Sequence, residues 1–144
     1  MSTLPKPVHE RLKSEFRVTA SKVAEARDIR GKIYYFSAFF GEASRQLNIH
    51  WHPDLALLWM VAQGACQAVN SRGAQTGDAD FPFGGFPDGL PQAINEVSNE
   101  LAVAFEGEEM DVPRLYAALA RAAELAYAMT GNGAYLCDKG MIRI

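Results

Sequence analysis

Apolar residues recur at intervals of three and four along most of this chain, and this spacing restricts the fold more than any other feature. In the first segment, residues 5–30, charged side chains separate the members of one apolar row. That row consists of Val8, Leu12, Phe16, Thr19, Val23 and Ala26. Because an α-helix turns once in about 3.6 residues, these positions lie on one side of it. The segment therefore predicts an amphipathic helix with one solvated face.

Four further segments have the same period and indicate an all-α fold. Their expected bounds are residues 32 to about 47, 53 to about 70, 91 to about 105 and 112 to about 130. Pro53 and Pro91 suit a first helical turn, and Asp111 suits the N-cap of the last helix. Alanines crowd residues 117–128, which favours close packing of that helix. We therefore expect a compact bundle of four to five helices that forms one domain over residues 1–144.

Gly31 leaves the join between the first two helices open. As a helix breaker it favours a bend or an end at this position. If the helix instead ran through Gly31, it would be about 60 Å long, which is more than a domain of this size can cover. A continuous helix would then require a partner subunit.

Two segments lack the helical period. Residues 74–90 form a loop rich in glycine and proline, with Phe81, Phe83 and Phe86 spaced along it. Because exposed phenylalanine is unfavourable in water, we expect this loop to dock on an apolar surface and to shape the main binding surface. The tail, residues 134–144, alternates weakly and predicts a short C-terminal β-hairpin.

Composition places the chain among ordinary globular proteins. Of its 144 residues 49% are hydrophobic and 22% are charged, so a core can form without metal or disulfide staples. The longest apolar run, residues 55–62, is far shorter than the roughly 20 residues of a membrane span. No secretory signal is recognised at the N-terminus. Together with only two distant cysteines, Cys66 and Cys137, this favours a cytoplasmic setting, although one long-range disulfide stays open.

The segment from His50 to Asp54 is the most suggestive chemically. His50, His52 and Asp54 could bind one divalent metal ion, because alternate side chains of an extended segment point the same way. A small metal-dependent, hydrolase-like enzyme would follow, with Glu96 or Glu100 as further ligands. The favoured interpretation is a structural corner before a helix, with Trp51 packed against it and no cofactor.

Basic residues near the N-terminus give a second alternative. Residues 1–32 contain eight lysines and arginines against four acids, whereas residues 33–111 contain two against eleven. Contacts to nucleic acid, within a larger complex, would come from Lys6, Arg11, Lys13 and Arg17. Interleaved glutamates cancel much of this charge, which weighs against an independent nucleic-acid site. Oppositely charged regions of one chain favour contacts between subunits.

Aromatic side chains suggest the interaction surface. The second helix is apolar around much of its circumference, and such a helix is buried centrally or at an interface. The expected interface residues are Tyr35, Phe36, Phe39, Phe40, Phe81, Phe83 and Phe86. We therefore expect a small soluble interaction or assembly protein without catalysis of its own. Its partner would be a second copy or a larger protein assembly, and not a membrane.

Overall fold

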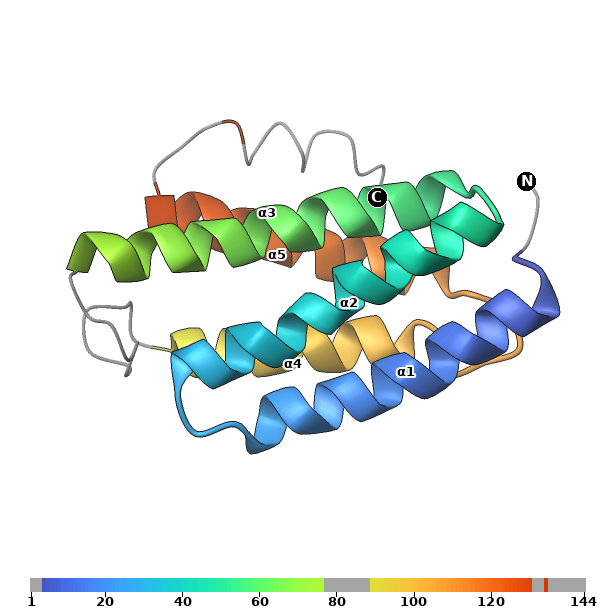
Figure 1. Ribbon diagram of the computed structural model, residues 1–144, viewed down its shortest axis with the longest axis horizontal. Helices are drawn as coiled ribbons and strands as arrows, with labels where there is room; N and C mark the ends of the chain where they lie inside the picture. The colour runs from blue at the N-terminus through green and yellow to red at the C-terminus, as the bar shows by residue number, and fades with distance from the viewer. Residues whose placement is uncertain (1–3, 77–88, 131–133, 135–144) are drawn as a thin grey trace.

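The computed structural model describes residues 4–76, 89–130 and 134. Five helices follow one another in this part of the chain, and none of its residues forms a strand. They are α1 (Lys6–Glu25), α2 (Ile29–Ile49), α3 (Pro53–Thr76), α4 (Leu90–Val103) and α5 (Val112–Thr130). Successive helices run in opposite directions along the long axis of the bundle (Figure 1). The all-α prediction is thus confirmed.

The join between α1 and α2 differs from the expectation. α1 ends at Glu25, and the break lies at residues 26–28 rather than at Gly31. Asp28 is the N-cap of α2, where its Oδ1 accepts a hydrogen bond of 2.6 Å from the backbone nitrogen of Gly31. A β-carbon at Gly31 would lie 3.2 Å from that oxygen. Gly31 therefore belongs to the first turn of α2, and one continuous helix is excluded.

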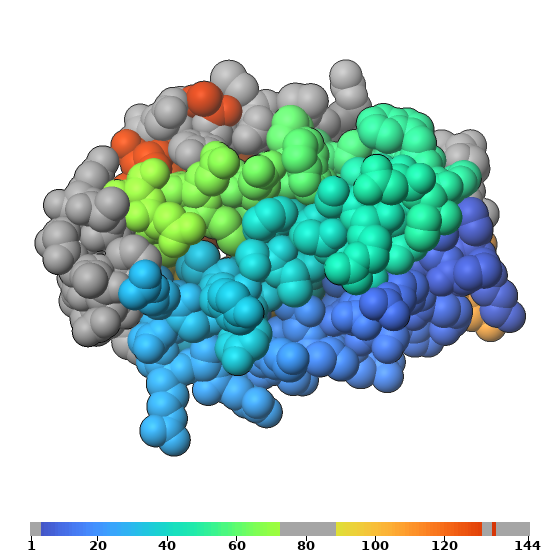
Figure 2. Space-filling view, viewed as in Figure 1, coloured from blue at the N-terminus to red at the C-terminus, as the bar shows by residue number. Residues whose placement is uncertain are grey.

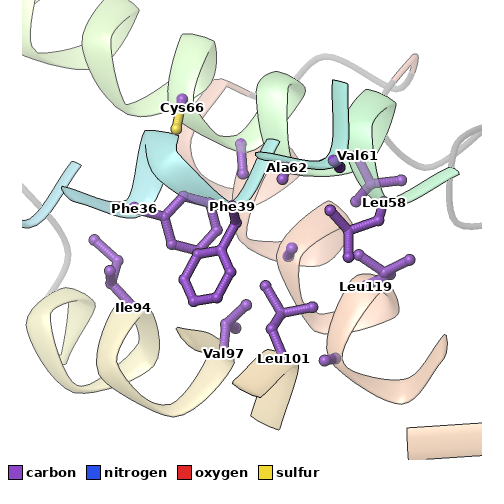
Figure 3. Close-up of a cluster of buried hydrophobic side chains, with 14 of the residues drawn as sticks. Phe36, Phe39, Leu58, Val61, Ala62, Cys66, Ile94, Val97, Leu101 and Leu119 are labelled. Atoms are coloured by element: carbon purple, nitrogen blue, oxygen red, sulfur yellow. The ribbon is translucent and has the colours of Figure 1, made fainter. Parts of the chain in front are cut away.

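Phenylalanine rings from different helices make up the centre of the core. The Phe39 ring lies edge-on to Phe16 and to Phe36, with centroids 4.9 and 5.4 Å apart, and Phe16 meets Phe105 at 5.0 Å. Edge-to-face geometry of this kind adds to the burial of apolar area. Figure 3 shows the side chains that surround Phe36 and Phe39, and among them are Leu58, Val61, Ala62, Cys66, Ile94, Val97, Leu101 and Leu119.

The second helix lies at the surface instead of the centre. In the space-filling view it crosses the front of the molecule between α1 and α3 (Figure 2). Phe36 and Phe39 are buried within the single chain. The expectation of an interface at these two residues stays a prediction. Tyr35 and Phe40 are half-buried, whereas Tyr34 is 72% exposed.

A buried lysine joins three of the helices. Lys32 of α2 donates hydrogen bonds of 2.9 Å from Nζ to the carbonyl oxygen of Val23 in α1 and to Oδ1 of Asn95 in α4. Burial lowers the pKa of Lys32, because a charged amine loses hydration there. The carbonyl of Val23 belongs to the last turn of α1, where main-chain acceptors lack helical partners. Lys32 thereby fixes the C-terminal end of α1 against the bundle.

Some expectations fall outside the described residues. They are the docking of Phe81, Phe83 and Phe86, the β-hairpin of the tail, and any role of Cys137. Cys66 is a buried, free thiol, and burial raises its pKa to about 12. Among the helices of the described part, none combines the length and the apolar character that crossing a membrane requires.

Candidate functional site

α1 begins at the end of the bundle where α2 meets α3 (Figure 1). Residues of this end line two hollows. The polar cleft has a volume of about 960 Å³ and is lined by Leu4, Pro5, Lys6, His9, Glu10, Lys13, His52, Asp54, Glu108, Glu109, Met110 and Val112. The apolar groove has a volume of about 600 Å³ and is lined by Ser44, Leu47, Asn48, Trp51, Pro53, Asp54, Ala56, Leu57, Trp59, Met60 and Tyr116. Asp54 borders both, so it separates the two hollows.

His52 shapes the corner between α2 and α3. Its Nδ1 accepts a hydrogen bond of 3.1 Å from the backbone nitrogen of Asp54. A ring nitrogen that accepts a hydrogen bond carries no proton, so the imidazole is neutral with its proton on Nε2. His52 acts in this way as a cap for the first turn of α3, and Pro53 occupies the first helical position, as expected.

The carboxylate of Asp54 is buried and only half satisfied. Its side chain is 5% exposed, and its Oδ1 accepts a hydrogen bond from the hydroxyl of Tyr116 in α5. Its Oδ2 lies 3.8 Å from Nδ1 of His52, which holds no proton to donate. Within the described part of the chain, no group donates a hydrogen bond to Oδ2. A buried acceptor without a donor is costly, so this oxygen is the least satisfied atom of the site.

Tyr116 responds electrostatically to this carboxylate. The hydrogen bond to Asp54, followed by burial and the negative charge of Asp54, raises the pKa of Tyr116 to about 12. The neutral phenol is favoured because ionisation would place two negative charges side by side. The phenol therefore stays protonated, as a donor, throughout the neutral and mildly alkaline range.

We expect Asp54→Asn to return the pKa of Tyr116 toward 10.0, its ordinary value. The substitution removes the negative charge and weakens the hydrogen bond, which are two of the three causes of the shift. Titration of ring-labelled tyrosine by NMR measures this directly, with Glu96→Gln as a control because Glu96 pairs with Arg121 instead. A Tyr116 resonance that titrates identically in Asp54→Asn and in the wild type would contradict the assignment.

His9 fastens the other side of the polar cleft. It is buried, its Nε2 donates a 2.7 Å hydrogen bond to the carbonyl oxygen of Gly107, and its ring centroid lies 5.9 Å from that of Phe105. This contact spans 98 positions of the sequence and holds the start of α1 against the turn between α4 and α5. His9 thus belongs to the wall of the cleft.

The expected metal ligands are not brought into one cluster. His50 is the C-cap of α2, and its buried Nε2 has no hydrogen-bond partner in the described part of the chain. Over residues 4–76 and 89–130, no three histidine, cysteine, aspartate or glutamate side chains are arranged to hold a metal ion. His52 and Asp54 instead form the structural corner. Trp51, which was expected to pack against this corner, is 68% exposed.

The other candidate residues are engaged elsewhere. Glu96 and Glu100 of α4 form ion pairs with Arg121 and Arg114 of α5, so the acidic face joins these two helices. Arg11 pairs with the buried Glu42 at 2.7 Å, and this contact raises the pKa of Arg11.

The four basic residues suggested for nucleic acid are thus divided. Arg11 is bound to a carboxylate of α2, Lys6 and Lys13 line the polar cleft, and Arg17 is exposed further along α1. Glu10 lines the same cleft as the two lysines. Because phosphate binding requires clustered and uncancelled positive charge, this arrangement does not favour a nucleic-acid surface.

Exposed apolar side chains gather beside the apolar groove. Ile49 is 70% exposed, Trp51 is 68% exposed and Trp59 is 39% exposed, and both tryptophans line the groove. Trp59 is partly exposed although most apolar side chains of α3 are in the core. Large apolar side chains that gather at one exposed place mark interaction surfaces more often than chance would give.

No protein-family model matches this chain, and neither a curated protein nor a solved structure matches it. The function is therefore inferred from the two hollows themselves. The sequence had indicated Asp54 and His52 at this end of the bundle but not His9 and Tyr116, which reach it only through tertiary packing.

Proposed function

We propose that this chain is a helical assembly protein that associates with a second copy of itself through the apolar groove. The observation that carries this proposal is the combination of a hollow with projecting side chains on one surface. Ile49 at the end of α2 and Trp51 in the turn that follows are exposed, next to a groove of about 600 Å³. The alternatives of a metal enzyme and of a nucleic-acid subunit have no comparable support in the geometry.

A second copy fits this surface because the surface is complementary to itself. In a twofold dimer the same patch meets itself, so each copy must offer both projecting side chains and a groove that accepts those of its partner. Here Ile49 and Trp51 of one copy can enter the groove of the other, where Leu57 and Met60 line the wall. Asp54 is the groove's only charged residue among those described, and it is buried, so charge does not attract an acidic or basic partner instead.

The energy of this contact indicates a reversible dimer. Complete burial of a large apolar side chain contributes roughly 1.5–3 kcal/mol. Ile49, Trp51 and Trp59 are already partly covered, so two copies would together gain roughly 5–10 kcal/mol. Association costs about 4–15 kcal/mol of translational and rotational freedom. Because gain and cost are of similar size, we expect a dimer that dissociates on dilution.

Light scattering across a dilution series tests the proposal. The wild type should approach twice the 15.8 kDa chain mass as its concentration rises. The double variant Ile49→Ser, Trp51→Ser should have a dissociation constant at least about tenfold higher, because buried tryptophans dominate such contacts. A wild type that stays at the monomer mass over the whole series would overturn the proposal.

Tyr34→Ser is the matched control. Tyr34 is 72% exposed, close to the 68% of Trp51, but lies on α2 about 22 Å along the helix axis from Ile49. Its substitution removes a comparable apolar area at a distance from the groove and should leave the dissociation constant unchanged. Equal losses of association in the control and in the double variant would show that the contact lies elsewhere.

A further inference from the structure

We infer that the polar cleft is a binding site for a compact aliphatic amine, with the ammonium group of the ligand held by Asp54. This site is separate from the apolar groove and does not depend on self-association. It takes its character from a carboxylate oxygen that is buried but unsatisfied.

The two oxygens of Asp54 face different sides. Oδ1 is bound by Tyr116, which lines the apolar groove and does not line the polar cleft. Oδ2 is the oxygen near His52, and His52 lines the polar cleft but not the apolar groove. The unsatisfied oxygen therefore lies on the cleft side of Asp54 but is itself covered, so a ligand reaches it when the Asp54 side chain turns toward the cleft. Asp54 itself is 4% exposed, so water in bulk does not replace the missing donor.

The neighbouring atoms require a ligand that donates hydrogen bonds. Oδ2 and Nδ1 of His52 lie 3.8 Å apart, and both are acceptors because Nδ1 already receives the backbone N–H of Asp54. A carboxylate or phosphate placed there would face lone pairs and a negative charge. An ammonium group offers three N–H donors and a positive charge, and it relieves the cost of the buried carboxylate.

The charges around the cleft favour the same ligand. Four acidic residues line it, namely Glu10, Asp54, Glu108 and Glu109, whereas Lys6 and Lys13 are the only bases among its described lining residues. With the histidines neutral, four negative and two positive charges leave a net charge of −2. The exposed glutamates of the turn after α4 can hold a second amine of the same ligand.

Apolar residues and size complete the fit. Leu4, Met110 and Val112 line the cleft and can contact a short hydrocarbon chain between two amines. A volume of about 960 Å³ lies within the ordinary range of small-molecule sites, which is about 300–1,000 Å³. A diamine with a short aliphatic chain therefore satisfies the polar and the apolar parts of the wall together.

Helix dipoles provide the competing argument. The N-terminal ends of α1, α3 and α5 all reach this end of the bundle, and such ends favour anions (Figure 1). The chain, however, already places its own carboxylates there. Asp54 lies in the first turn of α3, and Oδ1 of Asp111 accepts a 3.2 Å hydrogen bond from the backbone nitrogen of Arg114 at the start of α5. Inorganic phosphate is therefore used as a probe for the alternative, that the cleft binds an anion.

Titration of the full chain with 1,4-diaminobutane tests the inference. Saturable shifts of the backbone amide resonances of Asp54 and Val112 are expected in NMR spectra, with smaller or no shifts from the neutral 1,4-butanediol. Contacts between the methylene protons of the diamine and the side chain of Val112 should appear as intermolecular NOEs. Binding of phosphate without binding of the diamine, equal responses to diamine and diol, or absence of these NOEs would each overturn the inference.

Two variants test the contribution of the Asp54 carboxylate to binding independently of any effect on folding. Asp54→Asn should weaken binding of the diamine at least tenfold, since the amide keeps the shape but loses the charge. Glu96→Gln removes an exposed carboxylate of α4 outside the cleft and should bind as the wild type does. Circular dichroism shows whether each variant is folded. Undiminished binding by folded Asp54→Asn overturns the inference, and if that variant does not fold, the NOEs of the wild type decide it.

Discussion

Replacement of Phe39 by alanine is expected to lower the free energy of unfolding by about 3–5 kcal/mol. The Phe39 side chain has no exposed area, and its ring contacts those of Phe16 and Phe36 edge-on. Removal of the ring leaves a cavity that neighbours on α1 and α2 cannot close without moving their own rings. The loss therefore contains both the transfer of apolar area and the energy of the cavity.

Urea denaturation followed by circular dichroism measures this loss. The wild type and the variant must be compared at one protein concentration, because self-association stabilises the folded state by mass action. Tyr34→Ala is the control, since it removes an aromatic ring of the same helix that is 72% exposed. We expect the control to lie within about 0.5 kcal/mol of the wild type. A loss below about 1 kcal/mol for Phe39→Ala would contradict the packing described here.

The helices were predictable because their signals are local. The apolar row of the first segment, from Val8 to Val23, is buried along α1 as expected. Pro53 does begin α3, and Asp111 does cap α5 through its hydrogen bond to the nitrogen of Arg114. Each of these features depends on neighbours within one or two helical turns, so the sequence contains the whole signal.

The join between α1 and α2 shows how one local signal hid another. Gly31 suggested a break, since glycine is a poor helix former, but Asp28 lies three residues earlier and caps the helix that follows. An aspartate at the N-cap accepts a hydrogen bond from the backbone N–H two or three residues later, so Asp28 was itself a signal for the start of a helix. The cap therefore places the start of α2 before the glycine.

The orientation of α2 was not predictable from its pattern. Because apolar residues surround much of this helix, its period does not select an inner face. The structure places Lys32 and Glu42 inside, where Lys32 bonds to Val23 and Asn95 and Glu42 bonds to Arg11 and Arg45. Tyr34 is left outside. All of these partners except Arg45 come from other helices, so tertiary structure decides which side is covered.

The candidate site has the same dependence on distant contacts. His52 and Asp54 were recognised as a helix corner from adjacent residues alone. The hydrogen bond between Tyr116 and Asp54 spans 62 positions, and that between His9 and Gly107 spans 98. No spacing rule connects such residues in a single sequence. The metal hypothesis arose from the close spacing of His50 and His52 in the sequence, but among the described residues neither belongs to a group of three possible metal ligands.

The alanines of α5 lead to the second large effect. Ala118, Ala122 and Ala126 lie one turn apart and are all buried, and α5 packs against α3 and α4. Helix axes can approach closely only where the side chains between them are small. We therefore expect Ala118→Leu to lower the free energy of unfolding by about 1–3 kcal/mol, because the added atoms force neighbouring helices apart.

Ala117→Leu makes this prediction specific. Ala117 is the preceding residue of the same helix but is exposed, and alanine and leucine have similar helix propensities. The same chemical change at this position should therefore stay within about 0.5 kcal/mol of the wild type. Urea denaturation of both variants at one concentration gives the comparison. If Ala118→Leu were as stable as Ala117→Leu, the contact of α5 with its neighbours would be loose enough to admit a leucine, and small side chains would not be what sets the helix spacing.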